Sequence, residues 1–445
     1  MADGFRQENI EGISGDSGTK DFVSRSRFQE GRAMHALLIP FGTAGDVHPF
    51  IGVAIVLKQR GHRVTVFTDR AFEGIVRRNG LEFECLADRQ EYADLLQHPD
   101  LWHPTRSYPL IFKNLVAPKI KPVYDFIDRQ HTAGQTVVVA ANLALGARVA
   151  CDKLDLPLVS MYVSPMCFRS YLHPPSLPGL DLFPGRPRRW VSALFAIADW
   201  RVDRMLGPSL NSLCSQLGLP RVKKVMNWWH SRQLIIGLFP EWFAPLEPEW
   251  PDQTRLVGFP LYDTAGPSDL PADLELFLQS GPPPVVFMPS SFMAQGANFF
   301  RESVEACARL QCRGILLTQF PEQLPSNLPD NVRSFRFIPL SALLPRSAAI
   351  VHQAGIGTIA LAFAAGIPQL AVPTAMDQHA NAERLQKLGA GLVLNTRRYR
   401  GDRLAAEISD LMCNKTIRAS CQRLARQFVH ARPTEDACDL IEDMI

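Results

Sequence analysis

Short apolar runs alternate along the chain with longer segments that have the spacing of amphipathic helices. In the first half, runs with strand character cover residues 35–39, 62–68, 81–86, 136–140, 156–162 and 234–239. Residues 47–60 have the pattern of a helix, which Gly61 is expected to end. Such alternation is typical of a parallel sheet covered by helices. Residues 234–239 are predicted to form the last strand of this half.

The alternation stops in a proline-rich tract at 240–284. Proline removes a backbone donor and fixes φ, so this tract is predicted to be an extended connector. Strand-like runs then resume at 285–288, 314–318, 332–337, 348–351 and 369–372, with helical segments at 299–310 and after Gly355. A short helical pattern at 435–445 closes the chain. Two α/β halves joined by a connector are therefore expected.

The predicted domain organisation follows these changes of pattern. It comprises a disordered extension at 1–33, a first half at 34–258, a linker at 259–280 and a second half at 281–445 with the terminal helix. The extension is rich in glycine, serine and charged residues, and it lacks the apolar core of a secretory signal. Met34 directly precedes the first strand and is an alternative start.

Composition excludes several classes of protein. The 445 residues include 47 basic and 44 acidic side chains, and 46% are hydrophobic, which is typical of a globular protein rather than a disordered chain or a coiled coil. The balanced charge argues against a dedicated nucleic-acid binder. No apolar run reaches the roughly 18 residues of a membrane span. The nine cysteines form no CxxC pair, so free thiols in a reducing cytosol are expected.

A glycine-containing turn follows the first predicted strand, with the sequence Phe41-Gly42-Thr43-Ala44-Gly45-Asp46-Val47-His48-Pro49. Open α/β sheets bind ligands beyond the carboxyl ends of their strands, where loops meet helix N-termini. Gly42 and Gly45 would allow a tight turn and a close approach to a ligand. The sequence is not GxGxxG, so no dinucleotide site is predicted. The alternative is a plain turn in which Asp46 is the N-cap.

A second turn, His352-Gln353-Ala354-Gly355-Ile356-Gly357-Thr358, also lies between a strand and a helix. Its backbone N–H groups and the helix dipole favour binding of a diphosphate. His352 could donate a hydrogen bond or a positive charge, and Thr358 could donate its hydroxyl. The alternative is a glycine-rich turn with a solvated histidine.

A third feature, Asp377-Gln378, follows the next strand and opens another helix. Adjacent aspartate and glutamine side chains can make bidentate contacts with neighbouring sugar hydroxyls. Taken alone, the pair also fits an N-cap aspartate beside an exposed glutamine.

Together, the order from Phe337-Ile338-Pro339-Leu340 through HQAGIGT and AAGIPQLAVP to DQHANAERL resembles the donor box of GT-B glycosyltransferases that use nucleotide-sugars, family 1 or UDP-glycosyltransferase-like. Further segments, GTAGDVHPFIGVA, PDLWHP, HPPSLPG, FPEWFAP and VGFPLYD, are similar to the bacterial rhamnosyltransferases of rhamnolipid synthesis and their relatives. The resemblance covers the chain from Met34 to the C-terminal helix. It implies the α/β GT-B fold, in which two Rossmann-like parallel-sheet domains face a central cleft. The first half would bind the acceptor and the second half the donor.

The resemblance also implies roles for individual residues. Asp46 would be the general base, with His48 as a rival base. Phe337 would stack on the donor base, unless it is a core residue, and the Ile338 backbone would read the edge of that base. The full set of donor-binding residues would be Thr43, Gly45, Ser290, Ser291, Phe337, Ile338, His352, Gly355, Gly357, Thr358, Asp377 and Gln378. The acceptor side would include His48, Trp102, Tyr108 and Phe168, unless the aromatic residues belong to the core.

The chain departs from the family pattern at three places. Ala354 replaces a glycine, which would add strain of about 1 kcal/mol or more if the position needs a positive φ. Ala360 stands where plant members hold the ribose with a glutamate, which favours dTDP-rhamnose over UDP-glucose. Pro289-Ser290-Ser291 replaces a glycine-serine phosphate contact, and Pro289 removes one backbone donor.

The resulting prediction is an inverting hexosyltransferase that moves rhamnose or glucose from a dTDP- or UDP-sugar to a hydroxyl of an apolar small molecule or lipid, such as a hydroxy-fatty-acid. No Asp-x-Asp motif calls for a metal, and no cofactor is expected. The alternatives are an epimerase or hydrolase, a non-catalytic nucleotide-sugar-binding partner or sensor, and a UDP-glucose-dependent glucosyltransferase of an aromatic or polyketide product.

The expected location is the cytoplasm. The basic cluster at 186–190, which ends in Trp190, suggests peripheral contact with the inner face of the membrane, against the alternative of a solvated loop. The involvement of a second protein is left open.

Overall fold

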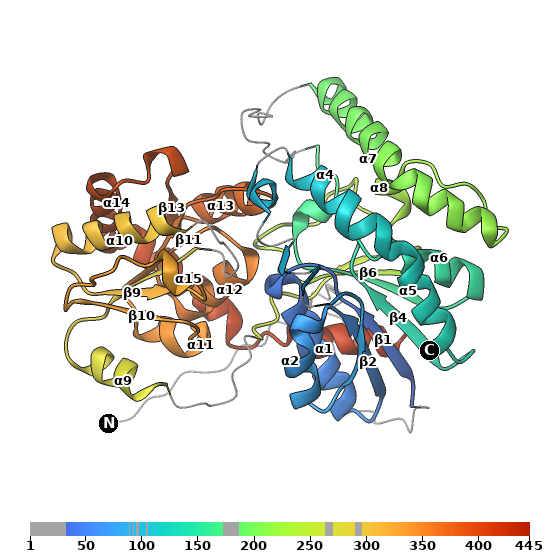
Figure 1. Cartoon of the computed structure of the whole chain (residues 1–445), viewed down its shortest axis with the longest axis horizontal. Helices are drawn as coiled ribbons and strands as arrows, with labels where there is room; N and C mark the ends of the chain where they lie inside the picture. The colour runs from blue at the N-terminus through green and yellow to red at the C-terminus, as the bar shows by residue number, and fades with distance from the viewer. Residues whose placement is uncertain are drawn as a thin grey trace, which may run out of the picture. The chain divides into compact units, whose positions relative to one another are not determined.

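The structure is a computed structural model, which describes residues 33–88, 90–91, 93–94, 98–103, 106–171, 187–262, 270–289 and 296–445. The side chains of Pro99 and Trp102 also lie outside the description. The predicted extension at 1–33 falls almost wholly outside the described residues. Two parallel β-sheets, each flanked by helices, form the described part of the chain (Figure 1).

The first sheet has seven parallel strands in the order β3-β2-β1-β4-β5-β6-β7. Its strands are β1 (His35–Ile39), β2 (Arg63–Thr68), β3 (Glu82–Cys85), β4 (Thr136–Ala140), β5 (Leu158–Tyr162), β6 (Leu234–Gly237) and β7 (Thr254–Leu256). The strand order reverses between β1 and β4, which pair in parallel with His35 opposite Thr136. Loops at such a reversal point spread apart and leave room for a ligand.

The second sheet has six parallel strands in the order β10-β9-β8-β11-β12-β13. They are β8 (Val285–Met288), β9 (Gly314–Leu317), β10 (Val332–Phe335), β11 (Ala349–His352), β12 (Gln369–Ala371) and β13 (Gly391–Val393). Here the order reverses between β8 and β11, and the loop that contains the HQAGIGT turn follows β11. Both glycine-containing turns therefore leave central strands at the carboxyl edge of a sheet.

Helices connect the strands. Those associated with the first sheet are α1 (Ala44–Gln59), α2 (Glu73–Arg78), α4 (Ser107–Ile111), α5 (Ala117–Gln130), α6 (Leu145–Leu154), α7 (Arg188–Gln216) and α8 (Val225–Trp228). The remaining helices are α9 (Ala272–Gln279), α10 (Ala297–Leu310), α11 (Leu340–Leu343), α12 (Ile356–Ala365), α13 (Gln378–Lys387), α14 (Gly401–Cys413), α15 (Lys415–Ala425) and α16 (Pro433–Glu442). In α5, Ile120, Val123 and Ile127 are spaced at helical intervals and all are buried, as an amphipathic pattern requires.

The proline-rich tract is more structured than the sequence predicts. Residues 234–239 do not form the last strand of the first sheet, because β7 lies within the tract and pairs in parallel with β6. The tract also contains α9, whose Leu274, Phe277 and Leu278 pack in a buried cluster with strands β8, β9 and β11. Prolines are tolerated beside a short edge strand and just before a helix, so they bound these elements without preventing them.

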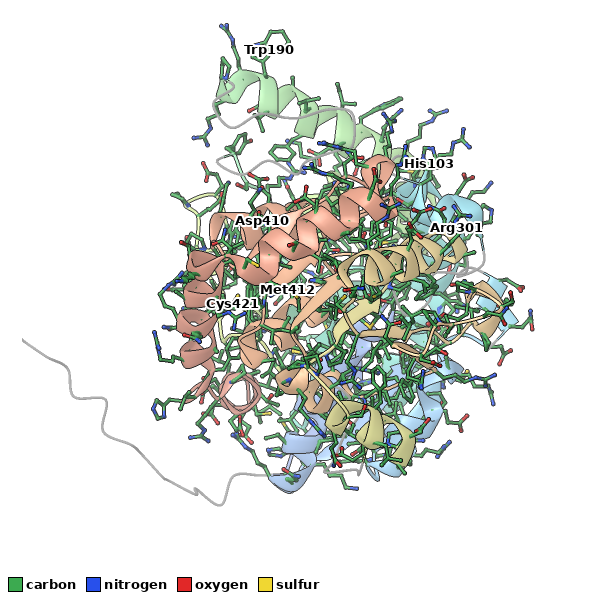
Figure 2. The ribbon with its side chains drawn as sticks, turned by 90° about the vertical axis from the view of Figure 1, so that its left-hand side faces the viewer. His103, Trp190, Arg301, Asp410, Met412 and Cys421 are labelled. Carbon is green, nitrogen blue, oxygen red and sulfur yellow. The ribbon has the colours of Figure 1, made fainter. Side chains whose placement is uncertain are left out.

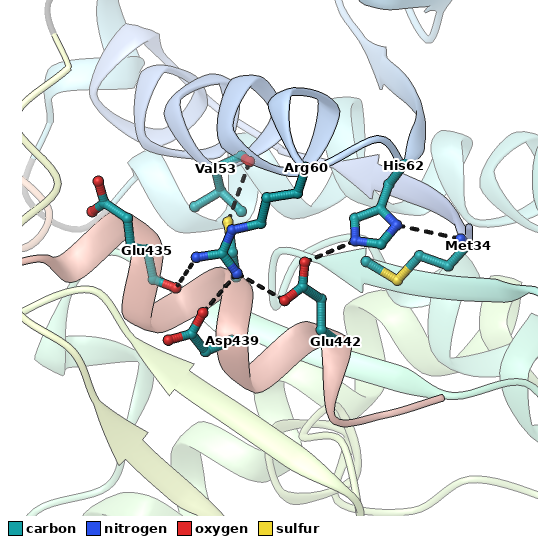
Figure 3. A network of polar contacts seen from close by, with 8 residues as sticks. Met34, Val53, Arg60, His62, Glu435, Asp439 and Glu442 are labelled. Carbon is teal, nitrogen blue, oxygen red and sulfur yellow. Dashed lines mark hydrogen bonds and ion pairs between the residues drawn. The ribbon is translucent and has the colours of Figure 1, made fainter. Parts of the chain in front are cut away.

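The terminal helix α16 was expected to belong to the second half, but it packs against α1 of the first. Ala437, Cys438 and Ile441 are fully buried in the core of the first sheet. Figure 3 shows the polar contacts beside them: Arg60 donates to Asp439 (2.6 Å) and Glu442 (2.8 Å). The chain thus returns to the half from which it started.

His62 completes this network. Its Nδ1 accepts a hydrogen bond from the Met34 backbone N–H (3.3 Å), so its Nε2 donates to Glu442 (2.7 Å). The start of β1 and the end of the chain are therefore held by one imidazole ring (Figure 3). In the described part of the chain, no helix is both long enough and apolar enough to span a membrane.

Candidate active site

The turn after β1 places the Asp46 carboxylate by means of a capping box. Thr43 is the N-cap of α1, and both its backbone N–H (2.8 Å) and its hydroxyl (3.1 Å) donate to Asp46 Oδ2. Asp46 is thus the third residue of the helix and not the N-cap that a plain turn would require. Because both donors end on Oδ2, Oδ1 is the oxygen that could receive a proton from a bound molecule.

Gly42 makes this arrangement possible. Its φ is +129°, and a Cβ added there would lie 2.4 Å from Asp46 Oδ2 and 2.8 Å from Asp46 Cγ. Only glycine tolerates both the backbone conformation and the close approach of the carboxylate. Gly45 is exposed, and the nearest atom to a Cβ added there is Thr43 Oγ1 at 3.9 Å.

In the second turn, His352 is buried and serves the loop itself. Its Nδ1 accepts a hydrogen bond from the Ala354 backbone N–H (3.1 Å), and its Nε2 donates to Gln369 Oε1 (3.1 Å). Burial lowers the pKa of His352 to about 4, although the hydrogen bond to Gln369 opposes this shift. The ring is neutral near pH 7, so the expected positive charge on His352, and its alternative as a solvated histidine, are both wrong.

Ala354, held by this histidine, has φ +62°. The position that carries alanine in place of glycine therefore does adopt the left-handed conformation, with strain of about 1–2 kcal/mol. Asn381 offsets this strain, because its Nδ2 donates both to the Ala354 carbonyl (3.1 Å) and to Asp377 Oδ2 (2.9 Å). One buried amide thus connects the second turn to the third feature.

The start of α12 has space for a ligand. Gly355 is the N-cap, and, apart from chain neighbours and the backbone of α12, no atom of the described residues lies within 4 Å of a Cβ added at Gly355 or Gly357. Thr358, in the first turn of α12, is half-buried. Unpaired N–H groups and the positive end of a helix dipole in such a setting favour an anion.

Asp377 and Gln378 lie at the start of α13 and differ in which of their atoms could bind a ligand. Burial raises the pKa of Asp377, and hydrogen bonds from Asn381 and the Ser164 hydroxyl partly offset this shift. Gln378 Oε1 accepts hydrogen bonds from the backbone N–H (2.8 Å) and the hydroxyl (2.8 Å) of Thr374. Since that oxygen holds the loop, the amide nitrogen is the atom of Gln378 that could contact a sugar.

Asp46 and Asp377 face a common region although they lie in different halves of the chain. Burial raises the pKa of Asp46 to about 6; the N–H of Thr43 opposes the shift and the charge of Asp377 adds to it. The charge of Asp377, after burial, also raises the pKa of Tyr108 and of Cys167. The Asp377 carboxyl group therefore lies near enough to Asp46, Tyr108 and Cys167 for its charge to affect all three.

Comparisons with known proteins agree with this arrangement. Residues 36–170 match the model described as the glycosyltransferase family 28 N-terminal domain. Residues 313–443 match the erythromycin biosynthesis protein CIII-like C-terminal domain. The chain is a glycosyltransferase with the GT-B fold. The predictions of fold and of enzyme class are thereby confirmed.

Individual relatives cover nearly the whole enzyme. The O-mycaminosyltylonolide 6-deoxyallosyltransferase of Streptomyces fradiae is 27% identical over 422 residues, which cover 92% of this chain and 97% of the relative. The crystal structure of the glycotransferase of kitacinnamycin matches with a TM-score of 0.71 at 20% identity over 93% of this chain and 99% of that one. The spinosyn rhamnosyltransferase SpnG complexed with thymidine diphosphate matches with a TM-score of 0.66 at 18% identity, over 92% and 100% of the two chains.

The other donor residues predicted for the glycosyltransferase lie as follows. Phe337 is 54% exposed, which excludes the alternative of a core phenylalanine and leaves its ring open to stacking. Ile338 is buried, so only its backbone could face a ligand. Ser290 and Ser291 lie outside the described residues.

The acceptor residues are only partly brought to the site of this enzyme. Phe168 is not an acceptor residue, because it is buried and its ring stacks on Trp250 at 4.2 Å between centroids. The His48 ring contacts Phe72 (6.3 Å) and Tyr262 (6.1 Å) edge to face, so it does not take the position of Asp46. The Trp102 side chain lies outside the described residues.

Tyr108 remains at the site. It is half-buried, and its hydroxyl donates to Met166 Sδ (3.4 Å). The segment after β5 was expected to line the acceptor side, but Ser164, Met166 and Cys167 were not singled out within it as site residues. The sequence could have identified these residues, because Val163-Ser164-Pro165 follows a central strand at the carboxyl edge of the sheet, where ligands bind. Among the described residues, no group of three or more His, Cys, Asp or Glu side chains is placed to hold a metal ion.

Proposed function

We propose that this enzyme is an inverting, metal-independent hexosyltransferase that moves rhamnose or glucose from a nucleoside-diphosphate sugar to the hydroxyl of an apolar acceptor. The observation that carries the proposal is the Asp46 carboxylate, which Thr43 holds at the start of α1 through two hydrogen bonds to Oδ2 while Oδ1 accepts neither of them. The charge of Asp377 adds to the rise of its pKa. Asp46 lies in the first turn of α1 and Asp377 is the N-cap of α13. The first half thus supplies a base and the second half a sugar-binding group. This division suits transfer of a sugar from a donor held by the second half to an acceptor held by the first.

Asp46 is the general base in this proposal. The acceptor hydroxyl gives its proton to Asp46 Oδ1 while its oxygen forms a bond to the anomeric carbon. The bond from that carbon to the diphosphate oxygen breaks on the opposite face, so the configuration inverts. A pKa of about 6 makes Asp46 a stronger base than an ordinary aspartate, whose pKa is 3.8, while leaving it mostly ionised at pH 7.

The leaving diphosphate is held by the start of α12. The N–H groups beside Gly355 and Gly357 and the hydroxyl of Thr358 supply the hydrogen bonds, and the helix dipole supplies partial positive charge. His352 is neutral and acts on the diphosphate only by holding Ala354 and the turn in place. Phe337 stacks on the nucleobase, and Asp377 with the Gln378 amide nitrogen holds the sugar hydroxyls.

A dTDP-sugar is the favoured donor. Ala360 is buried and carries no polar group for a ribose hydroxyl, so the site gains nothing from the 2′-hydroxyl that distinguishes UDP. The spinosyn relative was crystallised with thymidine diphosphate, which is in line with this choice. Rhamnose follows from the resemblance of the first half to the rhamnosyltransferases of rhamnolipid synthesis.

The acceptor belongs to one of two apolar classes. The resemblance of the segments PDLWHP and FPEWFAP to rhamnolipid rhamnosyltransferases favours a hydroxy-fatty-acid. The Streptomyces relative, named for its action on a tylonolide, favours a macrocyclic or polyketide secondary metabolite. We place the enzyme in the cytoplasm, where nucleotide-sugars are made, with no need for a second protein in the transfer step itself.

A donor and acceptor panel tests the proposal on the purified full chain. A donor at one hundred times its Kd should stabilise the protein by about 2.7 kcal/mol, read as a rise in Tm. We expect this rise with dTDP-sugars, and product formation with one acceptor class. A rise with UDP-sugars alone would refute the donor choice. Sugar release without any acceptor would indicate a hydrolase, and binding without turnover of any pair would indicate a non-catalytic nucleotide-sugar-binding protein.

A further inference from the structure

Helix α7 has two apolar faces, of which only one is covered. Val191, Phe195, Val202 and Leu206 are buried against the rest of the protein. On the opposite side, Trp190, Ile197 and Trp200 are 56%, 55% and 62% exposed. Spacings of seven and three residues place these three side chains on one face of the helix. Large exposed apolar side chains grouped in this way are typical of a surface that binds another protein or a membrane.

The exposed charges on α7 are all positive. Arg189, Arg201 and Arg204 are exposed beside the apolar residues. The two acids of the helix point elsewhere: Asp199 forms an ion pair with Arg169, and Asp203 accepts hydrogen bonds from the backbone N–H groups at 224 (2.9 Å) and 225 (2.8 Å). Within the described residues, no ion pair involves Arg189, Arg201 or Arg204.

The helix is also accessible. Figure 1 shows α7 along the outer side of the helices that cover the first sheet. Figure 2 shows Trp190 at the outer end of α7. A flat body could therefore approach the exposed face along several turns of the helix.

The positive charge of this face distinguishes between two candidate partners, a second copy of the chain and an anionic lipid bilayer. In a symmetric pair of chains the same face meets itself, so arginines would lie opposite arginines and repel. The surface of an anionic bilayer can satisfy both kinds of side chain. Its phosphate groups pair with arginines, and its headgroup level is where indole rings are favoured. A helix with such a face lies flat in the interface.

We propose that the outer face of α7, formed by Arg189, Trp190, Ile197, Trp200, Arg201 and Arg204, binds the surface of an anionic lipid bilayer. The contact runs along α7 from Arg189 to Arg204, which is more than three helical turns. It does not depend on which sugar is transferred. Its effect would be to hold the enzyme where an apolar acceptor concentrates.

Vesicle sedimentation with the full chain tests the proposal. Vesicles of equal parts phosphatidylglycerol and phosphatidylcholine should bind the protein at low salt, whereas pure phosphatidylcholine vesicles should bind it at least tenfold more weakly. High salt should weaken the anionic binding. Tryptophan emission should shift to shorter wavelength only with the anionic vesicles, because Trp190 and Trp200 enter the interface.

Two variants and two matched controls give the residue-level test. Replacing Arg189, Arg201 and Arg204 together by glutamate should lower vesicle affinity at least a hundredfold, at about fivefold for each lost arginine. Trp190→Ala with Trp200→Ala should abolish the emission shift. Arg397→Glu and Leu276→Ala alter an exposed arginine and an exposed leucine outside α7 and should leave binding unchanged.

Three outcomes would overturn the proposal. One is absence of binding to anionic vesicles by the wild-type chain while the donor still raises its Tm, which leaves an acidic protein as the partner of this face. The second is equal loss of binding in the Arg397→Glu control. The third is a concentration-dependent dimer, seen by gel filtration, that is lost in the tryptophan variant, because this would assign the face to a second copy.

Discussion

Replacing Gly42 by alanine tests whether the turn after β1 positions the Asp46 carboxylate. The new Cβ would lie 2.4 Å from Asp46 Oδ2, about 1 Å closer than the 3.4 Å at which ordinary contact begins. The carboxylate must move by about that distance or the turn must open. A displacement of about 1 Å at a catalytic group lowers kcat by about 100-fold. The positive φ adds about 1–3 kcal/mol of strain.

Gly61 provides the matched control. Its φ is +91°, but in the described part of the chain no atom other than those of its chain neighbours lies within 4 Å of an added Cβ, and it follows the far end of α1. Gly61→Ala should therefore lower Tm by a few degrees without a change in kcat. The assay is the initial rate of nucleoside diphosphate release with donor and acceptor saturating. If Gly42→Ala keeps kcat within twofold of Gly61→Ala, the turn does not set the geometry of the base.

Three further predictions follow from the same contacts. Because the pKa of Asp46 is about 6 and only the ionised form accepts a proton, kcat/KM should fall about tenfold per unit below pH 6 and level off above pH 7; a flat profile from pH 5 to 8 would contradict this. Ala354→Gly should raise the free energy of unfolding by about 0.5–1 kcal/mol, since relief of left-handed strain exceeds the entropy lost, whereas Ala364→Gly inside α12 should lower it by about 1 kcal/mol; denaturant midpoints decide. Arg60→Ala should lower stability by about 1–2 kcal/mol and speed hydrogen exchange in α16, because Asp439 loses its partner and Glu442 keeps only His62; unchanged exchange would show that the Arg60 contacts do not hold α16.

The turns that carry Asp46 and His352 could be predicted because their signal is local. Glycines between an apolar run and a helical pattern mark a strand-to-helix turn, and the spacing of the runs indicates parallel sheets. That Asp46 and Asp377 share a site is different, since they lie far apart in sequence. Only the family resemblance suggested that relation, because it depends on how two sheets are placed.

Other features are not encoded in any local pattern. The sequence of α16 predicts a helix but does not show that the helix returns to α1. The sequence cannot distinguish a phenylalanine that contacts an acceptor from one in the core. In the structure, Trp250 and its neighbours enclose Phe168 in the core. The charge of His352 depends on burial and on Gln369, which arrives from the next strand. Strand β7 was not predicted, because it has only three residues, too few for a recognisable pattern, and lies in a proline-rich tract.

Asp46→Asn tests the central claim most directly. The asparagine oxygen can still accept the hydrogen bonds from Thr43, so the turn should keep its form while the base is lost. We predict that the Tm rise caused by the donor is unchanged, that the transfer rate falls by about 100-fold or more, and that the limb of the pH profile near 6 disappears. A transfer rate within twofold of the wild-type chain, with the pH limb retained, would show that Asp46 is not the general base.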